Sequence, residues 1–204
     1  MTYLFAHPAT VVARLGEHLL LVALSLAIAL AIALPLGVLV ARNRRAGAIV
    51  LGVVGVIYTI PSLALLAILV AVLGLGTPTA IVALVAYAQM LLVRNIAEGL
   101  RAVSPAAVDA ARGLGFTSLQ SLVRVELPLA LPAIVGGIRI ATVSLIGIAT
   151  IAAWIDAGGL GALVFTGLHQ DDPQKILAGS LAAVALALVA DGALRLAERA
   201  AVRG

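Results

Sequence analysis

Residues Leu19–Ala41 read LLLVALSLAIALAIALPLGVLVA, a stretch with no charged residue. As an α-helix it would be roughly 34 Å long, which is enough to cross the hydrocarbon core of a bilayer. Four more apolar stretches follow, at about 46–75, 78–97, 127–154 and 176–194. They lack the period-two alternation of a membrane β-barrel. We therefore expect an all-α integral membrane protein with about five transmembrane helices, forming one domain of residues 1–204.

The composition excludes several classes of protein. Hydrophobic residues make up 63% of the chain and charged residues 11%, whereas a soluble domain is nearer half apolar and a quarter charged. The absence of cysteine excludes disulfides and thiolate metal sites, and the three histidines are too scattered for a metal site. The formal net charge of +4 comes with only 3% aromatic residues, so we expect no nucleic-acid binding.

Basic residues instead predict the orientation in the membrane. They cluster in the loop at Arg42–Arg45, in the loop of residues 98–126 and at the C-terminus. Cytoplasmic loops carry such excesses, so an even number of crossings separates the first two clusters. We therefore interpret 46–75 as one span, bent or broken at Pro61, rather than two short ones. The N-terminus would lie outside and the C-terminus inside, in a multi-pass protein of the inner or plasma membrane.

The loop of residues 98–126 is too long for a simple connection and has its own helix signals. Ser104 can cap a helix that begins with Pro105 and ends at Gly113 and Gly115. Thr117 can cap a second short helix, which we expect to end before Leu127-Pro128. Two short helices around a glycine turn would form an exposed docking knob on the cytoplasmic side.

The same segment resembles a known family. Asp109-Ala110-Ala111, three residues, Gly115, nine residues, Val125, one residue and Leu127-Pro128 match the signature loop of binding-protein-dependent ABC importer permeases. That signature has Glu and Ile where this chain has Asp109 and Val125. The resemblance implies a type I importer permease fold, with this loop as the coupling helix that docks on an ATPase subunit. The implied ATPase-coupling residues are Asp109, Ala110, Ala111, Arg112, Gly113, Gly115, Leu127 and Pro128.

A narrower resemblance covers most of the chain. The matching strings are Ile60–Leu66, Arg94-Asn95, Ala110–Gly115, Glu126–Pro132, Gly137–Arg139 and Gly158–Gly161. They are similar to the osmoprotectant branch, whose permeases carry glycine betaine, carnitine and choline. The implied partners are ABC ATPase subunits, a second permease chain (identical or related) and an extracytoplasmic solute-binding protein. The chain has no phosphate-binding loop, so it cannot itself be the ATPase. We expect that it is not an enzyme, and that ATP and Mg²⁺ bind to the partner ATPase.

Several polar residues in the spans are candidates for the translocation path. Tyr58, Thr59 and Ser62 surround Pro61, where freed backbone carbonyls could line a cavity, although a simple kink explains the proline equally well. In the fourth span Arg139 shares a helix stripe with Thr142 and Thr150. Arg139 faces the path or a dimer seam, or it is bonded to a neighbouring helix. We favour a structural or carboxylate-facing role, because the expected substrate is a cation.

The predicted external side offers a further candidate. Trp154 and Asp156 leave the fourth span and form a candidate gate, although tryptophan is also common at the membrane interface, an explanation we favour. Gly158-Gly159-Leu160-Gly161 lacks nucleotide-binding spacing and predicts a flexible or tightly turned loop. Asp191 and Arg195 predict an ordinary pair within one helix.

Two alternatives to the osmoprotectant hypothesis remain. An amino-acid or other small-solute permease of the same superfamily would have the same coupling loop. A secondary transporter without an ATPase would normally carry intramembrane carboxylates for ion coupling, and it would leave that loop unexplained.

Overall fold

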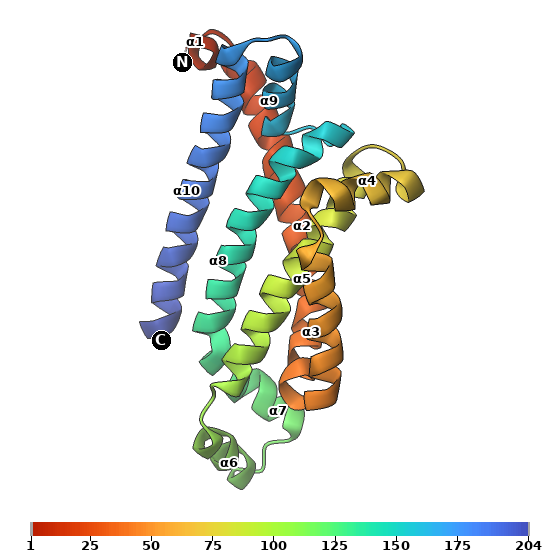
Figure 1. The fold of residues 1–204 in the computed structure, drawn as a ribbon. Helices are drawn as coiled ribbons and strands as arrows, with labels where there is room; N and C mark the ends of the chain where they lie inside the picture. The colour runs from red at the N-terminus through yellow and green to blue at the C-terminus, as the bar shows by residue number, and fades with distance from the viewer. Residues whose placement is uncertain (1, 204) are drawn as a thin grey trace.

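The computed structural model describes residues 2–203, which are helical with short connections. Four long helices form the bundle: α2 (Pro8–Arg42), α5 (Thr77–Arg101), α8 (Leu127–Ala152) and α10 (Pro173–Arg203). The predicted stretches 19–41, 78–97 and 176–194 lie inside α2, α5 and α10. The stretch 127–154 lies in α8 and the 3₁₀ turn η2 (Ala153–Ile155) that follows it. Figure 1 shows these helices running along one axis, with the short helix α6 (Pro105–Gly113) beyond one end.

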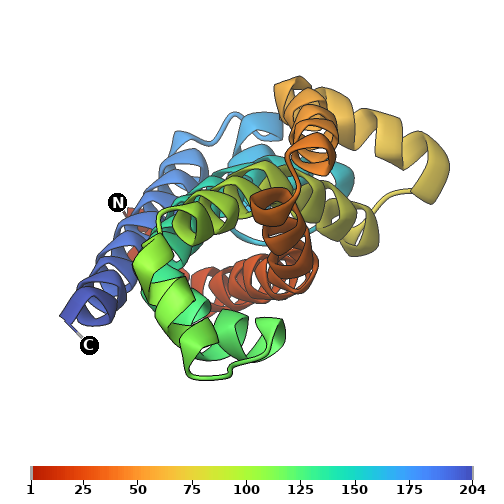
Figure 2. The same ribbon diagram turned by 90° about the horizontal axis from the view of Figure 1, so that it is seen from below.

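Helix α5 is the centre of the bundle, because it packs against α2 on one side and α8 on the other (Figure 2). Lipid supplies no hydrophobic force between helices, so their association depends on close van der Waals packing of small residues. Half of the most deeply buried hydrophobic residues of α5 are alanine. They are Ala80, Ala83, Leu84, Ala88, Leu92, Val93, Ile96 and Ala97. The helix backbones can therefore approach closely along this seam.

Two glycines set these helix crossings. A Cβ atom at Gly37 of α2 would lie 2.5 Å from the Ile96 side chain of α5, and one at Gly137 of α8 would lie 2.5 Å from Cβ of Asn95. Contacts this short are sterically impossible, so α5 can be held on both faces only because its neighbours lack side chains there.

The second apolar stretch is interrupted at the expected proline. Helix α3 (Arg44–Thr59) ends before Ile60-Pro61, and α4 (Ser62–Leu73) begins after it, bent by 97° from α3. Figure 1 shows α4 projecting sideways from the bundle. By length and composition, the four bundle segments can each cross a membrane, and α3 and α4 count as a fifth span only when taken together. The hydroxyl of Tyr87 donates to the Ile60 carbonyl, which supplies a partner for a backbone group at the break.

One predicted helix end is wrong. Helix α7 (Ser118–Ser121) does not stop before Leu127, because the chain continues through a π-helical turn, η1 (Leu122–Glu126), directly into α8. In a regular α-helix the ring of Pro128 would clash with the carbonyl of residue 124, so a wider turn before it accommodates the proline without ending the helix.

Helix α9 (Leu160–His169), which follows the tight turn at Gly158 and Gly159, was not predicted from the sequence. It lies at the end of the bundle where the short helix α1 (Thr2–Ala6) is found. Gly161 is buried in α9, and a Cβ atom there would lie 2.0 Å from the Thr150 carbonyl oxygen of α8. Gly179 of α10 makes a similar approach, at 2.9 Å from the Leu160 carbonyl oxygen. Glycines in this region thus serve helix packing as well as turns.

We expect Gly161→Ala to destabilise the fold, because backbone of α8 occupies the space that the methyl group needs. Overpacking of this kind costs about 1–3 kcal/mol or more. Gly52 of α3 is the matched control, since a Cβ atom there has no neighbour within 4 Å. Thermal unfolding of the purified protein in detergent should show a lower midpoint than wild type for Gly161→Ala and the wild-type midpoint for Gly52→Ala. Equal midpoints for the two variants would contradict this packing.

Candidate functional site

Helix α6 forms the outer part of the predicted coupling loop. Ser104 precedes Pro105 at its start, although the Ser104 side chain makes no capping hydrogen bond. At its end, the Gly115 N–H donates to the Arg112 carbonyl (2.9 Å) and the Phe116 N–H to the Ala111 carbonyl (3.1 Å). This pair of bonds is the Schellman motif, whose turn residue adopts a left-handed conformation. Gly115 has φ of +83°, which glycine adopts without the steric penalty of other residues.

Helix α7 begins with the predicted cap at Thr117. The Gln120 N–H donates to the Thr117 hydroxyl oxygen (3.3 Å), and the Thr117 N–H donates to the Gln120 side-chain oxygen (2.8 Å). This reciprocal capping box satisfies two donors that a helix start would otherwise leave unpaired. Both short helices of the loop are therefore fixed by local interactions encoded in their own sequence.

The predicted coupling residues fall into two groups. Asp109, Ala110, Arg112, Gly113 and Gly115 are exposed on α6 and its turn, whereas Ala111 faces inward and is buried. Leu127 and Pro128 lie apart from them, in the first turn of α8. Leu114 and Leu119, which the sequence analysis did not single out, are 77% and 69% exposed beside the first group. The loop thus presents apolar side chains and small residues outward, as a surface that docks on another protein does.

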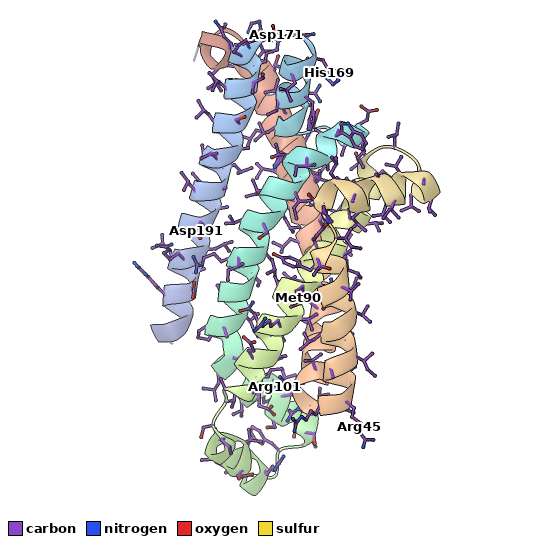
Figure 3. The ribbon with its side chains drawn as sticks, viewed as in Figure 1. Arg45, Met90, Arg101, His169, Asp171 and Asp191 are labelled. Atoms are coloured by element: carbon purple, nitrogen blue, oxygen red, sulfur yellow. The ribbon has the colours of Figure 1, made fainter. Side chains whose placement is uncertain are left out.

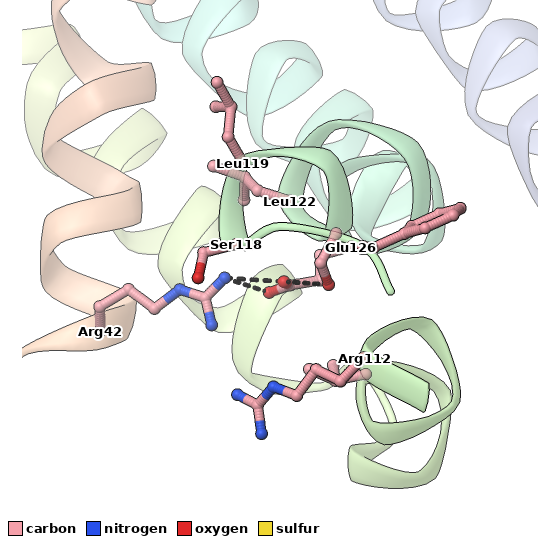
Figure 4. Close-up of a pocket in the computed structure, with 9 residues that line it drawn as sticks. Arg42, Arg112, Ser118, Leu119, Leu122 and Glu126 are labelled. Carbon is pink, nitrogen blue, oxygen red and sulfur yellow. Dashed lines mark hydrogen bonds and ion pairs between the residues drawn. The ribbon is translucent and has the colours of Figure 1, made fainter. Parts of the chain in front are cut away.

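A cavity of about 430 Å³ lies between this loop and the end of α2. Its lining includes Arg42, Arg112, Ser121 and Glu126 (Figure 4). The Glu126 carboxylate is buried and accepts hydrogen bonds from Nη2 of Arg42 at 2.7 and 2.6 Å and from the Ser121 hydroxyl at 3.1 Å. Sequence analysis missed this pair, because 84 residues separate its members.

The candidate path residues near Pro61 lie against α5. The ring of Tyr58 contacts that of Tyr87 edge to face, with 6.0 Å between the centroids. The Thr59 hydroxyl donates to the Val56 carbonyl at 2.7 Å within its own helix. Pro61 is the N-cap of α4, and Ser62 is the first residue of that helix.

The candidate residues of α8 face a different neighbour. Thr142 and Thr150 donate to the carbonyls of Ile138 (2.7 Å) and Ile146 (3.0 Å), so their hydroxyls are used within the helix. They line apolar crevices that α8 forms with α10, and with α2 in the case of Thr142. The structure therefore does not join them to the Tyr58 group in one site.

Arg139 points toward two acidic residues of α10. Its Nη1 lies 2.8 Å from Oδ1 of Asp191, and its Nε lies 3.0 Å from Oε2 of Glu198. Asp191 also pairs with Arg195 at 3.1 Å, so the ordinary pair expected within this helix is in fact part of a network between two helices (Figure 3 labels Asp191). Two cations and two carboxylates compensate one another, which removes the cost of an unpaired arginine in a span.

At the opposite end of the bundle, two side chains of helix α2 bind the glycine turn, which is formed by Gly158 and Gly159. The Gly159 N–H donates to the Glu17 carboxylate (2.9 Å) and the Leu160 N–H to Nδ1 of His18 (3.3 Å). Because Nδ1 accepts, Nε2 carries the proton, and it lies 3.2 Å from the Ile146 carbonyl oxygen. Neither Glu17 nor His18 was identified from the sequence, since 142 residues separate them from their partners.

The candidate gate residues lie beside this turn. Trp154 is 51% exposed, and Asp156 adopts a left-handed conformation with φ of +61°. Asp156 borders a cavity of about 360 Å³ that Arg14 and Glu17 also line. The structure therefore places the predicted gate residues next to the contact between α2 and the glycine turn.

We expect Arg139→Gln to lower the free energy of unfolding by about 1–3 kcal/mol, because Asp191 loses a charged hydrogen-bond donor and Glu198 loses its ion-pair partner. Arg195→Gln is the control: it removes the exposed arginine of the same network, whose pairs are usually worth about 0.5 kcal/mol or less. Thermal unfolding in detergent checks both. A midpoint that falls equally in the two variants would argue against a structural role for Arg139.

Comparison with known proteins identifies the family. Residues 33–203 match the model of the binding-protein-dependent transport system inner membrane component. The glycine betaine/carnitine/choline transport system permease protein OpuCB of Bacillus subtilis is 37% identical, with 98% of this chain and 92% of that protein covered. The osmoprotectant import permease protein OsmW of Salmonella typhimurium is 40% identical, with 86% of this chain and 84% of that protein covered.

Solved structures agree on the fold. A chain of the inward-facing MetNI methionine ABC transporter superposes with a TM-score of 0.83 and 25% identity, covering 96% of this chain and 98% of that one. A chain of an amino acid ABC transporter with histidines gives a TM-score of 0.74 at 19% identity, covering 96% and 95%. These matches confirm the predicted type I importer permease fold. The chain belongs to the family of binding-protein-dependent transport system inner membrane components.

Proposed function

We propose that this chain is the permease subunit of an ABC importer for a quaternary-ammonium osmoprotectant such as glycine betaine, choline or carnitine. The observation that carries the proposal is the coupling loop, where the family signature coincides with an exposed, Schellman-capped helix. The solute class rests on relatives at 37–40% identity over most of their length, which are named as permeases for these compounds.

The partners follow from this assignment. The chain supplies one coupling loop, so a complex with two ATPase subunits would need a second permease chain, identical or related. ATP and Mg²⁺ would bind to the ATPase subunits, and closure of these subunits would carry the coupling loops with them. The spans would then change between inward-open and outward-open states, and a solute-binding protein would deliver the solute to the side where the N-terminus lies.

The path through the membrane is also a proposal. Tyr58, Thr59, Pro61 and Ser62 would contribute from the bend between α3 and α4, and Thr142 and Thr150 from α8. Arg139 would hold α10 in place rather than contact a cationic solute, because its guanidinium faces carboxylates. Trp154 and Asp156 would lie at the external mouth. With aromatic residues at 3% of the chain, a full cation–π cage for the solute is better placed on the binding protein.

An amino acid is the alternative solute, since the superposed chains belong to a methionine ABC transporter and an amino acid ABC transporter. Those chains are 25% and 19% identical to this one, less than the osmoprotectant permeases. The sequence relatives therefore favour the osmoprotectant.

We expect Gly115→Ala to weaken coupling to the ATPase, because a left-handed conformation costs a residue with a Cβ atom about 1–2 kcal/mol. The changed turn would misplace α6 in the docked complex. Uptake by proteoliposomes containing the full complex should fall several-fold. Gly192→Ala on α10 is the control, since a Cβ atom there meets nothing within 4 Å. Wild-type uptake in Gly115→Ala would count against the docking role of the loop.

The solute class can be tested on the complete transporter. Uptake of labelled glycine betaine, choline or carnitine by proteoliposomes should require both ATP and the solute-bearing binding protein. A binding protein that ignores all three compounds and binds an amino acid would contradict the osmoprotectant proposal and favour the alternative. Uptake without ATP would contradict the importer itself.

A further inference from the structure

The last turn of helix α2 contacts the chain at the start of the coupling loop. Arg101 is the last residue of α5, at the lower end of the bundle in Figure 3, and its Nη2 donates to the Val40 carbonyl oxygen of α2 at 2.5 Å. The carbonyls of a last helical turn lack partners within the helix and attract cations. Gly47 leaves room for the contact, because a Cβ atom there would lie 3.1 Å from the same oxygen.

The same turn of α2 also contacts the chain at the end of the coupling loop. Arg42 is the last residue of α2, and its Nη2 contacts both oxygens of Glu126, at the point where η1 joins α8 (Figure 4). Glu126 is 3% exposed as a whole residue, and its carboxylate also accepts a hydrogen bond from the Ser121 hydroxyl. A buried carboxylate with this many donors is held firmly, and removal of its cation leaves an uncompensated charge.

Both ends of the coupling loop are thus attached to one turn of a helix that is not their neighbour in the chain. Covalently, the loop is connected only to α5 and α8. The two polar contacts add α2 as a third point of attachment, so a displacement of the loop acts on three spans at once.

We propose that the last turn of α2 is the anchor through which movement of the coupling loop reaches the membrane-spanning helices, with Arg42, Arg101 and Glu126 as positioning residues. The proposal rests on the function proposed above and deepens it. The loop, the end of α5, the start of α8 and the end of α2 then move as one unit when the ATPase subunits close.

The first test separates ATP hydrolysis from transport in proteoliposomes that contain the full complex and its binding protein. Glu126→Gln keeps the side-chain volume but removes the charge. We expect ATP hydrolysis to continue while solute imported per ATP falls about fivefold, the factor that corresponds to about 1 kcal/mol. The exchange R42E/E126R should restore most of that ratio. A merely structural role would lower both rates together.

The control is Arg94→Gln, which breaks an exposed ion pair near the end of α5 and outside the coupling loop. The Arg94–Glu98 pair is exposed and lies within α5 alone, so it joins no two helices. We expect its ratio of import to hydrolysis to match the wild type. A wild-type ratio in Glu126→Gln, or an exchange variant no better than Glu126→Gln, would overturn the proposal. If wild-type uptake itself does not need ATP, the proposed function fails instead.

A second test does not depend on the stability of the charge variants. The chain contains no cysteine, so Arg42→Cys and Glu126→Cys can be combined and bridged with a thiol-cleavable bifunctional reagent. If the two positions move as one unit, bridging should raise solute imported per ATP above the unbridged value, and cleavage of the bridge should lower it again. Loss of uptake on bridging would show that the positions must separate during transport, which overturns the proposal.

Discussion

Backbone polar groups in a membrane must find partners within the protein, and this constraint explains where the chain is interrupted. At three of the described interruptions, a side chain from another helix supplies the hydrogen-bond partner. The Tyr87 hydroxyl donates to the Ile60 carbonyl at the bend between α3 and α4, and the Glu17 carboxylate accepts from the Gly159 N–H at the turn of Gly158 and Gly159. The Arg101 guanidinium donates to the Val40 carbonyl where α2 ends. The same contacts that make these breaks tolerable also hold neighbouring helices together.

This arrangement separates two kinds of region. The seam of α5 with α2 and α8 is close-packed through alanines and glycines, so it suits rigid movement of the helices as a body. The coupling loop, in contrast, is fixed by local devices, the Schellman turn at Gly115 and the capping box at Thr117. The conformational entropy of the loop is lost when the protein folds rather than when the loop docks. The preformed loop can therefore transmit force to the close-packed bundle as soon as it is docked.

The sequence predicted the parts that depend on local pattern. Apolar stretches predicted the long helices because lipid demands them, and Pro61, Gly115 and Thr117 marked local breaks and caps through their backbone chemistry. Pairs of distant residues had no such signal: Arg42–Glu126, Arg139–Asp191 and Glu17–Gly159 are separated by 84, 52 and 142 residues. Helix α9 was missed for a related reason, since Gly161 resembles a turn residue but serves contact with α8.

We propose that the coupling loop docks on a separate ATPase. It is tested most directly by a photo-crosslinking amino acid placed at Leu114 or Leu119, the exposed apolar residues of the loop, in the assembled complex. This docking predicts crosslinks to the ATPase subunit from these positions and none from Leu168, a leucine of α9 that is also exposed, at the other end of the bundle. Crosslinks to the ATPase from Leu168, or their absence from both loop positions, would contradict it.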